Sequence, residues 1–489
     1  MQNEGEFILG KYKLNILSEC LVSKTFVLSV CLLVTDYIAI ISAEQSAFVL
    51  RNCIVPHGGF LHISWLNFWV VFPLLYLLFI NIEQLYNRRM QFWQIIEKIF
   101  HSSLYAIIAI VVILYIGQIA DSTSRLFVLL LWLLSFIYLT VFRYLTKKIL
   151  AKLQLLQIPV LIIGAGKTAE LLVQGIINDA GMGYKVIGLL EDNCVKAGIL
   201  KRFNVLGKFA DAEAVIEKTG VQHIFIAAPG MEQEKLTQLI YKVQPLVKNM
   251  GIIPNLVGIP MGGIEVESLF NEKLMLLRLK NNLARPWNRY LKTMFDFVLT
   301  LVGTVAISPI LLFIAIWIYK DSPGPVIFKH TRIGKNGKAF PCYKFRSMCV
   351  NAKARLEELL KNDPEAKAEW ERDFKLKNDP RITKSGAFLR KTSLDELPQI
   401  FNVLKGEMSL VGPRPVIQEE LKRYGEYVND YLMVKPGITG MWQVSGRSDI
   451  DYQERVLLDS WYVRNWSVWI DMVMLFKTFK VVLLRKGAY

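Results

Sequence analysis

Two adjacent carboxylates, Asp395 and Glu396, lie in a strongly basic stretch and are the most chemically suggestive feature of the sequence. Side by side, one carboxylate can bind a divalent cation while the other attacks an electrophile or takes a proton. Nearby guanidinium groups would lower the pKa of both carboxyl groups and hold a phosphate. Ser393 and Glu396 also have the spacing of a capping box at a helix start. A catalytic dyad and a helix cap both stay open on these residues alone.

Basic, glycine-rich segments surround the dyad. Lys344 and Arg346 are two residues apart, so both project from one face of a strand, and Asn336-Gly337 predicts a tight turn before that strand. A solvated basic face is the alternative for this cluster. Arg414 stands between two prolines, which suits anion recognition, and another glycine-rich loop ends at Arg447.

The composition narrows the class of protein. The 489 residues are 53% hydrophobic and 20% charged, with a net charge of +16, which disfavours a disordered chain and an ordinary cytosolic enzyme. Six cysteines without a C-x-x-C pair disfavour a disulfide scaffold and a thiolate zinc site. Residues 281–489 hold 33 basic and 22 acidic residues, so this part could meet nucleic acid, anionic lipid or a phosphorylated substrate.

The apolar segments favour a membrane protein. Four of them approach the length of about 20 residues that a bilayer helix needs. Lysine and arginine collect before the first, between the second and third, and after the fourth, so both ends of the predicted bundle face the cytoplasm. Asp36 lies inside the first span and is expected to pair within the bundle or near the interface. The predicted spans are Phe26–Ala43, Ile63–Ile82, Leu104–Ala120 and Leu126–Phe142.

A fifth apolar run, Phe295–Ile318, contains Ser308-Pro309 at its middle. Proline removes a helical hydrogen bond and forces a kink, and a neighbouring serine can satisfy the carbonyl that is left over. A straight crossing would place the basic C-terminal part outside the cell, against the distribution of positive charge. We therefore expect a kinked, re-entrant helix, with a simple fifth span as the alternative.

Residues 155–265 alternate between strand and helix signals. A Gly-rich turn, Gly164–Ala169, follows a short apolar run, and Glu191 and Asp192 follow the next strand, as in a dinucleotide fingerprint. A turn that only closes a strand–helix unit is the alternative. No Tyr-x-x-x-Lys pair is suitably placed downstream, so dehydrogenase chemistry is the second choice. The expected strands are Pro159–Ile163, Lys185–Leu190, His223–Ala227 and Ile252–Asn255.

These motifs together resemble the bacterial polyprenyl-phosphate sugar-1-phosphate transferases, in their large form. The resemblance covers residues 285–489 as a catalytic domain, and the order of parts matches the whole chain. It implies a four-helix transmembrane domain (1–150), a Rossmann-like accessory module (151–280) and an α/β catalytic domain anchored by the re-entrant helix (281–489). The matching motifs are Ser308-Pro309, Tyr343–Met348, Asn378–Arg381, Asp395-Glu396, Gly412–Pro415 and Lys435–Arg447.

The resemblance also implies the reaction. Asp395 matches a nucleophile that attacks the β-phosphorus of a UDP-sugar and expels UMP, and Glu396 matches the Mg²⁺ ligand beside it. Undecaprenyl phosphate then takes the sugar phosphate, at the cytoplasmic face of the bacterial inner membrane, as the first membrane step of O-antigen, capsule or exopolysaccharide synthesis. The basic residues expected to bind substrate phosphates are Lys344, Arg346, Arg381, Arg390, Arg414 and Arg447.

Several points stay open at this level. Overall likeness favours galactose over glucose, and no single residue decides between them. Family members often carry Lys-Arg at the start of the re-entrant helix, whereas here Lys292 precedes Thr293, with Asp296 retained. The resemblance implies no nucleic-acid partner and leaves a homodimer open. The competing class is a membrane-tethered nucleotide-binding protein or oxidoreductase.

Overall fold

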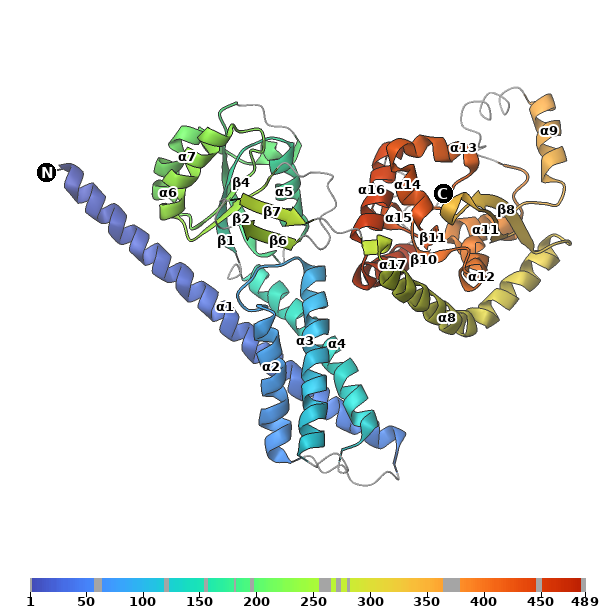
Figure 1. Cartoon of the computed structure of the whole chain (residues 1–489), viewed down its shortest axis with the longest axis horizontal. Coiled ribbons are helices and arrows are strands. Elements are labelled where there is room, and N and C mark those ends of the chain that lie inside the picture. The colour runs from blue at the N-terminus through green and yellow to red at the C-terminus, as the bar shows by residue number, and fades with distance from the viewer. Residues whose placement is uncertain are drawn as a thin grey trace. The chain divides into compact units, whose positions relative to one another are not determined.

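The computed structural model places the chain in two compact units, residues 1–257 and 258–489 (Figure 1). The first unit holds the N-terminal helices and a parallel sheet, and the second holds the long helix α8 and the domain around it. The structure describes residues 2–56, 64–117, 123–153, 157–179, 182–193, 198–254, 265–269, 274–278, 282–363, 379–445 and 451–484.

The N-terminal helices agree with three of the four predicted spans. By length and composition, Phe26–Ile54 of α1, α3 and α4 could each cross a membrane, and so could α8. The second predicted span is shorter than expected: a five-residue π-helical turn leads into the 11-residue α2. The helices are α1 Gln2–Ile54, η1 Asn67–Val71, α2 Phe72–Ile82, α3 Phe92–Ile116 and α4 Arg125–Lys152.

A buried ion pair lies inside this bundle. Arg143 on α4 donates from Nε to Oδ1 of Asp36 on α1 at 2.7 Å, and the Tyr86 hydroxyl donates to Oδ2 at 2.8 Å. The expectation that Asp36 pairs within the bundle is confirmed. Apolar side chains close the rest of the core, among them Ile40 and Tyr76.

The middle of the chain forms a five-stranded, wholly parallel sheet in the order β3-β2-β1-β4-β5. Its central strand is apolar on both faces because helices cover them both. Three expected strands agree with β1, β2 and β4 to within one residue at each end. The last one was misplaced, because β5 shares only Ile252 with it, and its expected end at Asn255 lies outside the described residues. The elements are β1 Ile158–Ile163, α5 Lys167–Asn178, β2 Tyr184–Leu190, β3 Val205–Gly207, α6 Ala212–Thr219, β4 His223–Ile226, α7 Gln233–Val243 and β5 Asn249–Ile252.

The second unit is built from short elements around α8. Two antiparallel ribbons, β6–β7 and β8–β9, and one parallel pair, β10–β11, are its described sheets. The strands are β6 Glu265–Leu269, β7 Leu274–Arg278, β8 Ile327–Ile333, β9 Ala339–Phe345, β10 Ser409–Val411 and β11 Gly437–Thr439. The helices are α8 Pro286–Asp321, α9 Ala352–Asn362, α11 Lys384–Thr392, η9 Leu394–Gln399, α12 Ile400–Leu404, α13 Gln418–Leu421, α14 Val428–Met433, α15 Met441–Ser445, α16 Tyr452–Asn465 and α17 Val468–Leu484.

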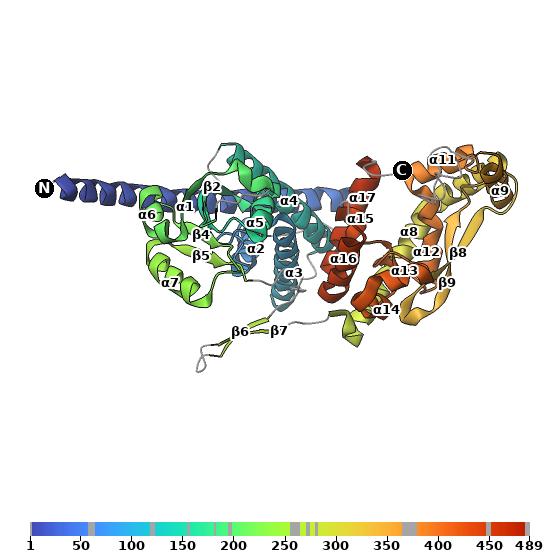
Figure 2. The same cartoon turned by 90° about the horizontal axis from the view of Figure 1, so that it is seen from above.

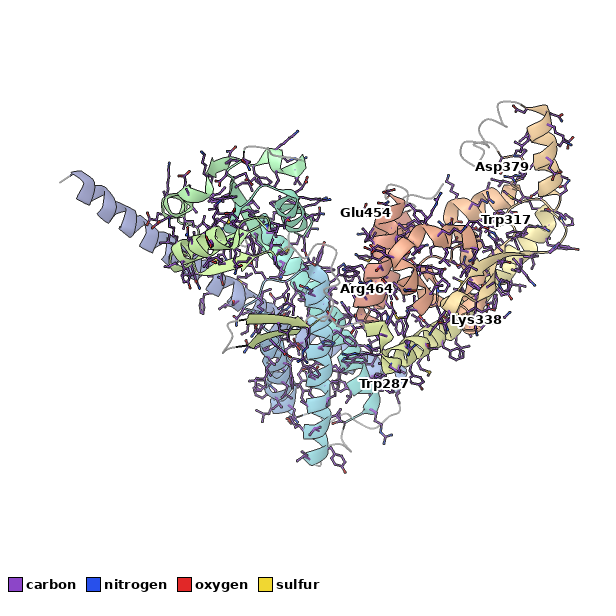
Figure 3. All side chains as sticks on the ribbon, turned by 45° about the horizontal axis from the view of Figure 1, so that its top comes forward. Trp287, Trp317, Lys338, Asp379, Glu454 and Arg464 are labelled. Carbon is purple, nitrogen blue, oxygen red and sulfur yellow. The ribbon has the colours of Figure 1, made fainter. Side chains whose placement is uncertain are left out.

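Helix α8 bends near its middle, where the sequence predicts a kink (Figure 1). Pro309 has no amide hydrogen for the carbonyl of Val305, and the Ser308 hydroxyl donates to that carbonyl at 2.9 Å. The serine thus satisfies the oxygen that the proline leaves without its helical partner. Trp287 and Trp317 lie near the two ends of the bent helix (Figure 3).

The second half of α8 packs against other elements of the second unit. Ile314 and Ile318 pack on Phe345 of β9 and Leu389 of α11, and the β8–β9 ribbon lies alongside (Figure 2). Asn336 and Gly337 both have positive φ in the turn between β8 and β9, as predicted for a tight Asn-Gly turn.

Candidate active site

The dyad lies in η9, a short 3₁₀ helix that follows α11 directly. Ser393 separates the two helices with a left-handed backbone, φ 57°, and its side chain makes no capping hydrogen bond. The capping-box interpretation is therefore wrong. Leu394 and Leu397, which flank the two carboxylates, pack into the cluster built on α8. The bent helix thus positions the segment that carries Asp395 and Glu396.

A lysine from the neighbouring strand binds one of the two carboxylates. Lys344 Nζ of β9 lies 2.6 Å from Oε1 of Glu396, and both side chains are partly exposed. Lys344 faces Phe328 across the ribbon, so strand pairing fixes where its side chain starts. The structure therefore brings together the dyad and one of the predicted phosphate-binding residues.

Burial, rather than neighbouring cations, dominates the electrostatics of Asp395. Burial raises the pKa of the Asp395 carboxyl above its ordinary value; Lys344 and Arg390 lower it, and the charge of Glu396 raises it further. The net shift is upward, opposite to the reduction expected from the basic surroundings. A partly desolvated carboxylate of this kind is a stronger nucleophile once ionised.

Asn402 holds the dyad segment against β9, although no sequence motif predicted this role. Its Oδ1 accepts from the Tyr343 amide at 3.0 Å, and its Nδ2 donates to the Pro341 carbonyl at 2.8 Å. The Asn402 side chain, on α12, is fully buried. Its amide group pairs with the backbone of β9 as the backbone of a neighbouring strand would. An Asn just after an apolar helix start carries no motif of its own, so only the tertiary contact reveals this role.

Contacts hold helix α11 in its first turn and again near its C-terminal end. Oδ2 of Asp321, at the end of α8, accepts from the Ser385 amide at 2.9 Å and its hydroxyl at 2.8 Å. A Cβ on Gly386 would come within 2.0 Å of the Ser347 carbonyl oxygen, so only glycine permits this approach. Arg390 Nε then donates to the Ser347 hydroxyl at 2.9 Å.

Arg346 and Arg381 bind protein groups other than the dyad. Arg346 is buried and donates to the carbonyl of Ser322, in the turn that follows α8. Arg381 donates from Nε to Oδ1 of Asp379 at 2.8 Å, and although burial raises the pKa of Asp379, these hydrogen bonds lower it overall. Substrate binding by either arginine stays a prediction.

Arg414 lies in a cluster of cations and aromatic rings. Its guanidinium is 5.7 Å from the ring centre of Trp442, and Arg455 is 4.2 Å from the same ring. Beneath them is Asp459, whose pKa burial raises to about 7. The Tyr424 hydroxyl donates to Asp459 at 2.9 Å. The sixth predicted phosphate ligand, Arg447, lies outside the described residues.

A buried network ties the first half of α8 to the loop that carries Arg414. Lys292 Nζ is 2.8 Å from Oδ2 of Asp471 on α17, and Oδ2 of Asp296 accepts from the Ser409 hydroxyl at 2.7 Å. Ser409 begins β10, which leads directly to Gly412-Pro413-Arg414. Lys292 therefore acts as an internal anchor of α8, whereas the hydroxyl of Thr293 donates to the Arg289 carbonyl at 2.8 Å.

An apolar cleft of about 190 Å³ opens beside the dyad. Glu396 forms part of its wall, and so does Thr478 of the C-terminal helix α17, whose hydroxyl is 2.7 Å from that of Thr439. The site thus offers charged groups and an apolar surface side by side. The aliphatic residues in its wall are Leu394, Leu397, Ile400, Ile438 and Val444.

The donor set at the dyad fits Mg²⁺ only together with substrate. Among the described residues, no group of three or more His, Cys, Asp or Glu side chains could hold a metal alone. Mg²⁺ is ordinarily held by one or two carboxylates, with waters and substrate phosphates completing its shell. Glu396 would be such a carboxylate, with Asp395 beside it, and Mg²⁺ binding here stays a prediction.

Comparison with known proteins agrees with this geometry. The family model described as bacterial sugar transferase matches residues 287–485, which contain all of α8 but its first residue and every other element of the site. The chain is also 43% identical over 407 residues to the undecaprenyl-phosphate galactose phosphotransferase of Salmonella typhimurium, covering 83% of this chain and 84% of that protein. The chain belongs to the bacterial sugar transferase family.

Two other relatives match different lengths of this transferase. Exopolysaccharide production protein ExoY of Rhizobium meliloti is 46% identical over 206 residues, which are 42% of this chain and 91% of that protein. The UDP-glucose:undecaprenyl-phosphate glucose-1-phosphate transferase of Escherichia coli is 33% identical over 338 residues, 65% of this chain and 66% of that protein. The match to ExoY is about as long as the bacterial sugar transferase part of this chain.

The parallel sheet of the transferase has a cavity of its own. A family model described as CoA-binding domain matches residues 79–254. A cavity of about 750 Å³ lies at the carboxyl ends of the strands, and Gly166, Lys167, Glu191 and Asp192 from the predicted fingerprint line it. Oε2 of Glu191 accepts from the Ala165 amide at 2.6 Å, which fixes the Gly-rich turn against the end of β2.

Proposed function

We propose that this protein transfers a hexose 1-phosphate from a UDP-sugar to undecaprenyl phosphate and releases UMP. The observation that carries the proposal is the Asp395-Glu396 dyad, held by Lys344 inside the domain that defines the family. Galactose 1-phosphate is the preferred group, because identity is higher to the galactose phosphotransferase than to the glucose enzyme. UDP-glucose is the alternative donor.

The first step is covalent. An ionised oxygen of Asp395 attacks the β-phosphorus of the donor, and the bond from that phosphorus to the bridging oxygen breaks. UMP leaves with the bridging oxygen and its electron pair, and the sugar phosphate stays on Asp395 as an acyl phosphate. Lys344 and Arg390, which already interact with the dyad, oppose the charge that collects on the phosphoryl oxygens.

The second step restores the enzyme. A phosphate oxygen of the acceptor attacks the same phosphorus, the bond to Asp395 breaks, and the carboxylate re-forms beside the lipid-linked sugar diphosphate. Mg²⁺, held by Glu396 with Asp395 beside it, would neutralise charge on the donor diphosphate. The apolar cleft beside Glu396 gives the first isoprene units of the acceptor a place to lie.

The membrane position follows from α8. Its exposed surface is apolar on both sides of the bend, and its bend at Pro309 supports a helix that enters and leaves on one face. Positive charge in the flanking loops supports the cytoplasmic face of the inner membrane, where the reaction would begin an O-antigen, capsule or exopolysaccharide unit. A homodimer stays a prediction.

The nucleotide product tests this function. The purified full-length protein, reconstituted in lipid, receives undecaprenyl phosphate, Mg²⁺ and one donor at a time: UDP-galactose, UDP-glucose or either N-acetyl form. We expect release of UMP, at the highest rate with UDP-galactose. More than one UMP per enzyme molecule should form only when undecaprenyl phosphate is present. Release of UDP would mean that the sugar moves without its phosphate, and the proposal would be wrong.

A second, accessory function is supported by the cavity at the carboxyl edge of the sheet. Ligands of open parallel sheets bind at this edge, and Gly166 leaves room for a phosphate at the start of α5. We infer that the module binds a nucleotide there without doing chemistry on it. Adding UMP, UDP, CoA or NAD should raise the unfolding temperature, and Gly166→Asp should abolish the shift.

A further inference from the structure

A second cavity of the first unit lies at the opposite, amino edge of the parallel sheet and has a volume of about 730 Å³. Four of its wall residues are the first residues of β1, β2, β4 and the following β5: Ile158, Tyr184, His223 and Asn249. The other walls come from α1, from the segment between α2 and α3, and from α4. This cavity therefore sits where the helical bundle meets the sheet.

Direct hydrogen bonds hold the two sides of this junction together. Arg89, just before α3, donates to the carbonyl oxygens of Met182 at 3.1 Å and Gly183 at 3.3 Å. The amide of Phe92, at the start of α3, donates to Oδ2 of Asp179 at 2.7 Å. The junction is thus a packed contact with defined partners, and the cavity lies beside these hydrogen bonds.

The charge around the cavity is entirely of one sign among its described wall residues. Arg88, Arg89, Lys147 and Lys248 line it together with His223, and no Asp or Glu of the described wall is present. Burial, then the charges of Arg89 and Lys248, lowers the pKa of His223 below its ordinary value. Cations from three separate elements therefore face one space, and an anion there would relieve their repulsion.

The remaining wall is apolar and belongs to α1. Phe26, Leu28 and Leu32 line it, and Phe26 begins the part of α1 that could cross a membrane. Basic groups and the start of a helix that could cross a membrane thus line the same cavity. A phospholipid combines the same two features, because it has a charged phosphate in its headgroup and hydrocarbon chains below it.

We propose that this cavity binds the phosphate of an anionic phospholipid, with an acyl chain lying along the first turns of the α1 span. Basic pockets at the cytoplasmic ends of membrane helices bind such headgroups. A soluble nucleotide shares the phosphate, but the apolar wall of Phe26, Leu28 and Leu32 favours the lipid. Bound there, the lipid would contact α1, α4 and the sheet, and would stabilise their junction.

Lipid binding to the full-length protein tests this proposal without reference to turnover. The delipidated protein in detergent is titrated with phosphatidylglycerol or phosphatidylcholine, and both thermal unfolding and lipid retention in native mass spectrometry are recorded. We expect phosphatidylglycerol to raise the unfolding temperature and to stay bound, and phosphatidylcholine to do neither. Equal effects of the two lipids would overturn the proposal.

Variants locate the effect. Arg88 and Lys248 are exposed, so R88Q/K248Q should fold normally and bind phosphatidylglycerol about twenty-fivefold more weakly, from about fivefold for each charge near the membrane surface. K148Q is the matched control, since Lys148 is exposed on α4 and is not part of the described wall. Unchanged binding in the double variant would contradict the site, and so would displacement of the lipid by inorganic phosphate or UMP at equal concentration.

Discussion

Two ion pairs with similar chemistry do different things in the two units. In the bundle, the side chains of Arg143 and Asp36 are 2% and 0% exposed, and both carboxylate oxygens accept from the guanidinium. In the catalytic unit, the side chains of Lys344 and Glu396 are 28% and 33% exposed, and the lysine binds one oxygen.

The two ion pairs differ in whether water and other groups can reach them. The Asp36 carboxylate is fully satisfied inside the protein, because Tyr86 adds a third hydrogen bond. Such a pair fixes two helices, and removing one partner leaves a buried charge. The Lys344–Glu396 pair is partly exposed to water and adjoins Asp395, and the proposed function requires substrate to bind beside it. A closed pair therefore predicts a stability phenotype and an open pair predicts an activity phenotype.

The largest expected effect is on activity alone. Asp395→Asn should reduce UMP release about 10⁴-fold or more, the scale on which the loss of a covalent nucleophile acts. The variant should unfold at no lower temperature than the natural protein, because an ionised Asp395 is costly to bury. Asp451→Asn is the matched control, since Asn also caps α16. Appreciable turnover in Asp395→Asn would contradict the role of this residue.

The bundle pair should behave in the opposite way. Arg143→Gln leaves Asp36 buried without its cation, and we expect a loss of about 3–5 kcal/mol in unfolding free energy. The rate per folded molecule should stay unchanged. Asp36→Asn/Arg143→Gln should regain part of the lost stability, as measured by denaturant unfolding in detergent. If the second substitution instead lowered the unfolding free energy further, by as much as it does alone, the two residues would not be coupled.

The open pair should also set the acid side of the pH–rate profile. Asp395 must be ionised to attack, so activity falls as the pH drops through its raised pKa. Lys344 favours the ionised form, and Lys344→Gln should raise this pKa further and move the acid limb to higher pH. Lys338→Gln, at an exposed lysine of the same ribbon, should leave the limb in place. A shift to lower pH in Lys344→Gln would contradict the account.

The smallest effect concerns the bend in α8. This helix contains neither ion pair, but it packs against the strand and the short helix that hold Lys344 and Glu396. Ser308→Ala removes the donor to the Val305 carbonyl and should cost about 1 kcal/mol in stability. Thr293→Val removes a hydroxyl that bonds to Arg289 inside a regular turn and should cost less. Thermal unfolding of both variants in lipid measures the difference. Equal losses would mean that the serine does nothing special at the proline.

Local signals in the sequence predicted the parts of the fold that depend on neighbouring residues. Ser308-Pro309 predicted the bend, Asn336-Gly337 predicted the β8–β9 turn, and alternating strand and helix signals predicted the parallel sheet. The capping box failed because the left-handed backbone of Ser393 ends α11 and starts a new helix. The predicted spans were also inexact in length, because α1, α3 and α4 are longer than predicted and α2 is shorter.

The site beyond the dyad depends on contacts that sequence spacing does not contain. Asp296 and Ser409 are 113 residues apart, and Lys292 and Asp471 are 179 residues apart. Asn402 likewise acts through β9, 59 residues earlier. The basic motifs predicted that arginines gather in this unit, but tertiary packing decided that Arg346 binds a backbone carbonyl and that Arg381 binds Asp379.

Trapping the covalent intermediate tests the central claim most directly. The reconstituted protein is mixed with Mg²⁺ and UDP-galactose labelled with ³²P at the β-phosphorus, without acceptor, then denatured and separated. We predict label on the natural protein, none on Asp395→Asn, and release of the label when undecaprenyl phosphate is added before denaturation. Full turnover by a protein that never carries the label would contradict the account, and so would label that persists in Asp395→Asn.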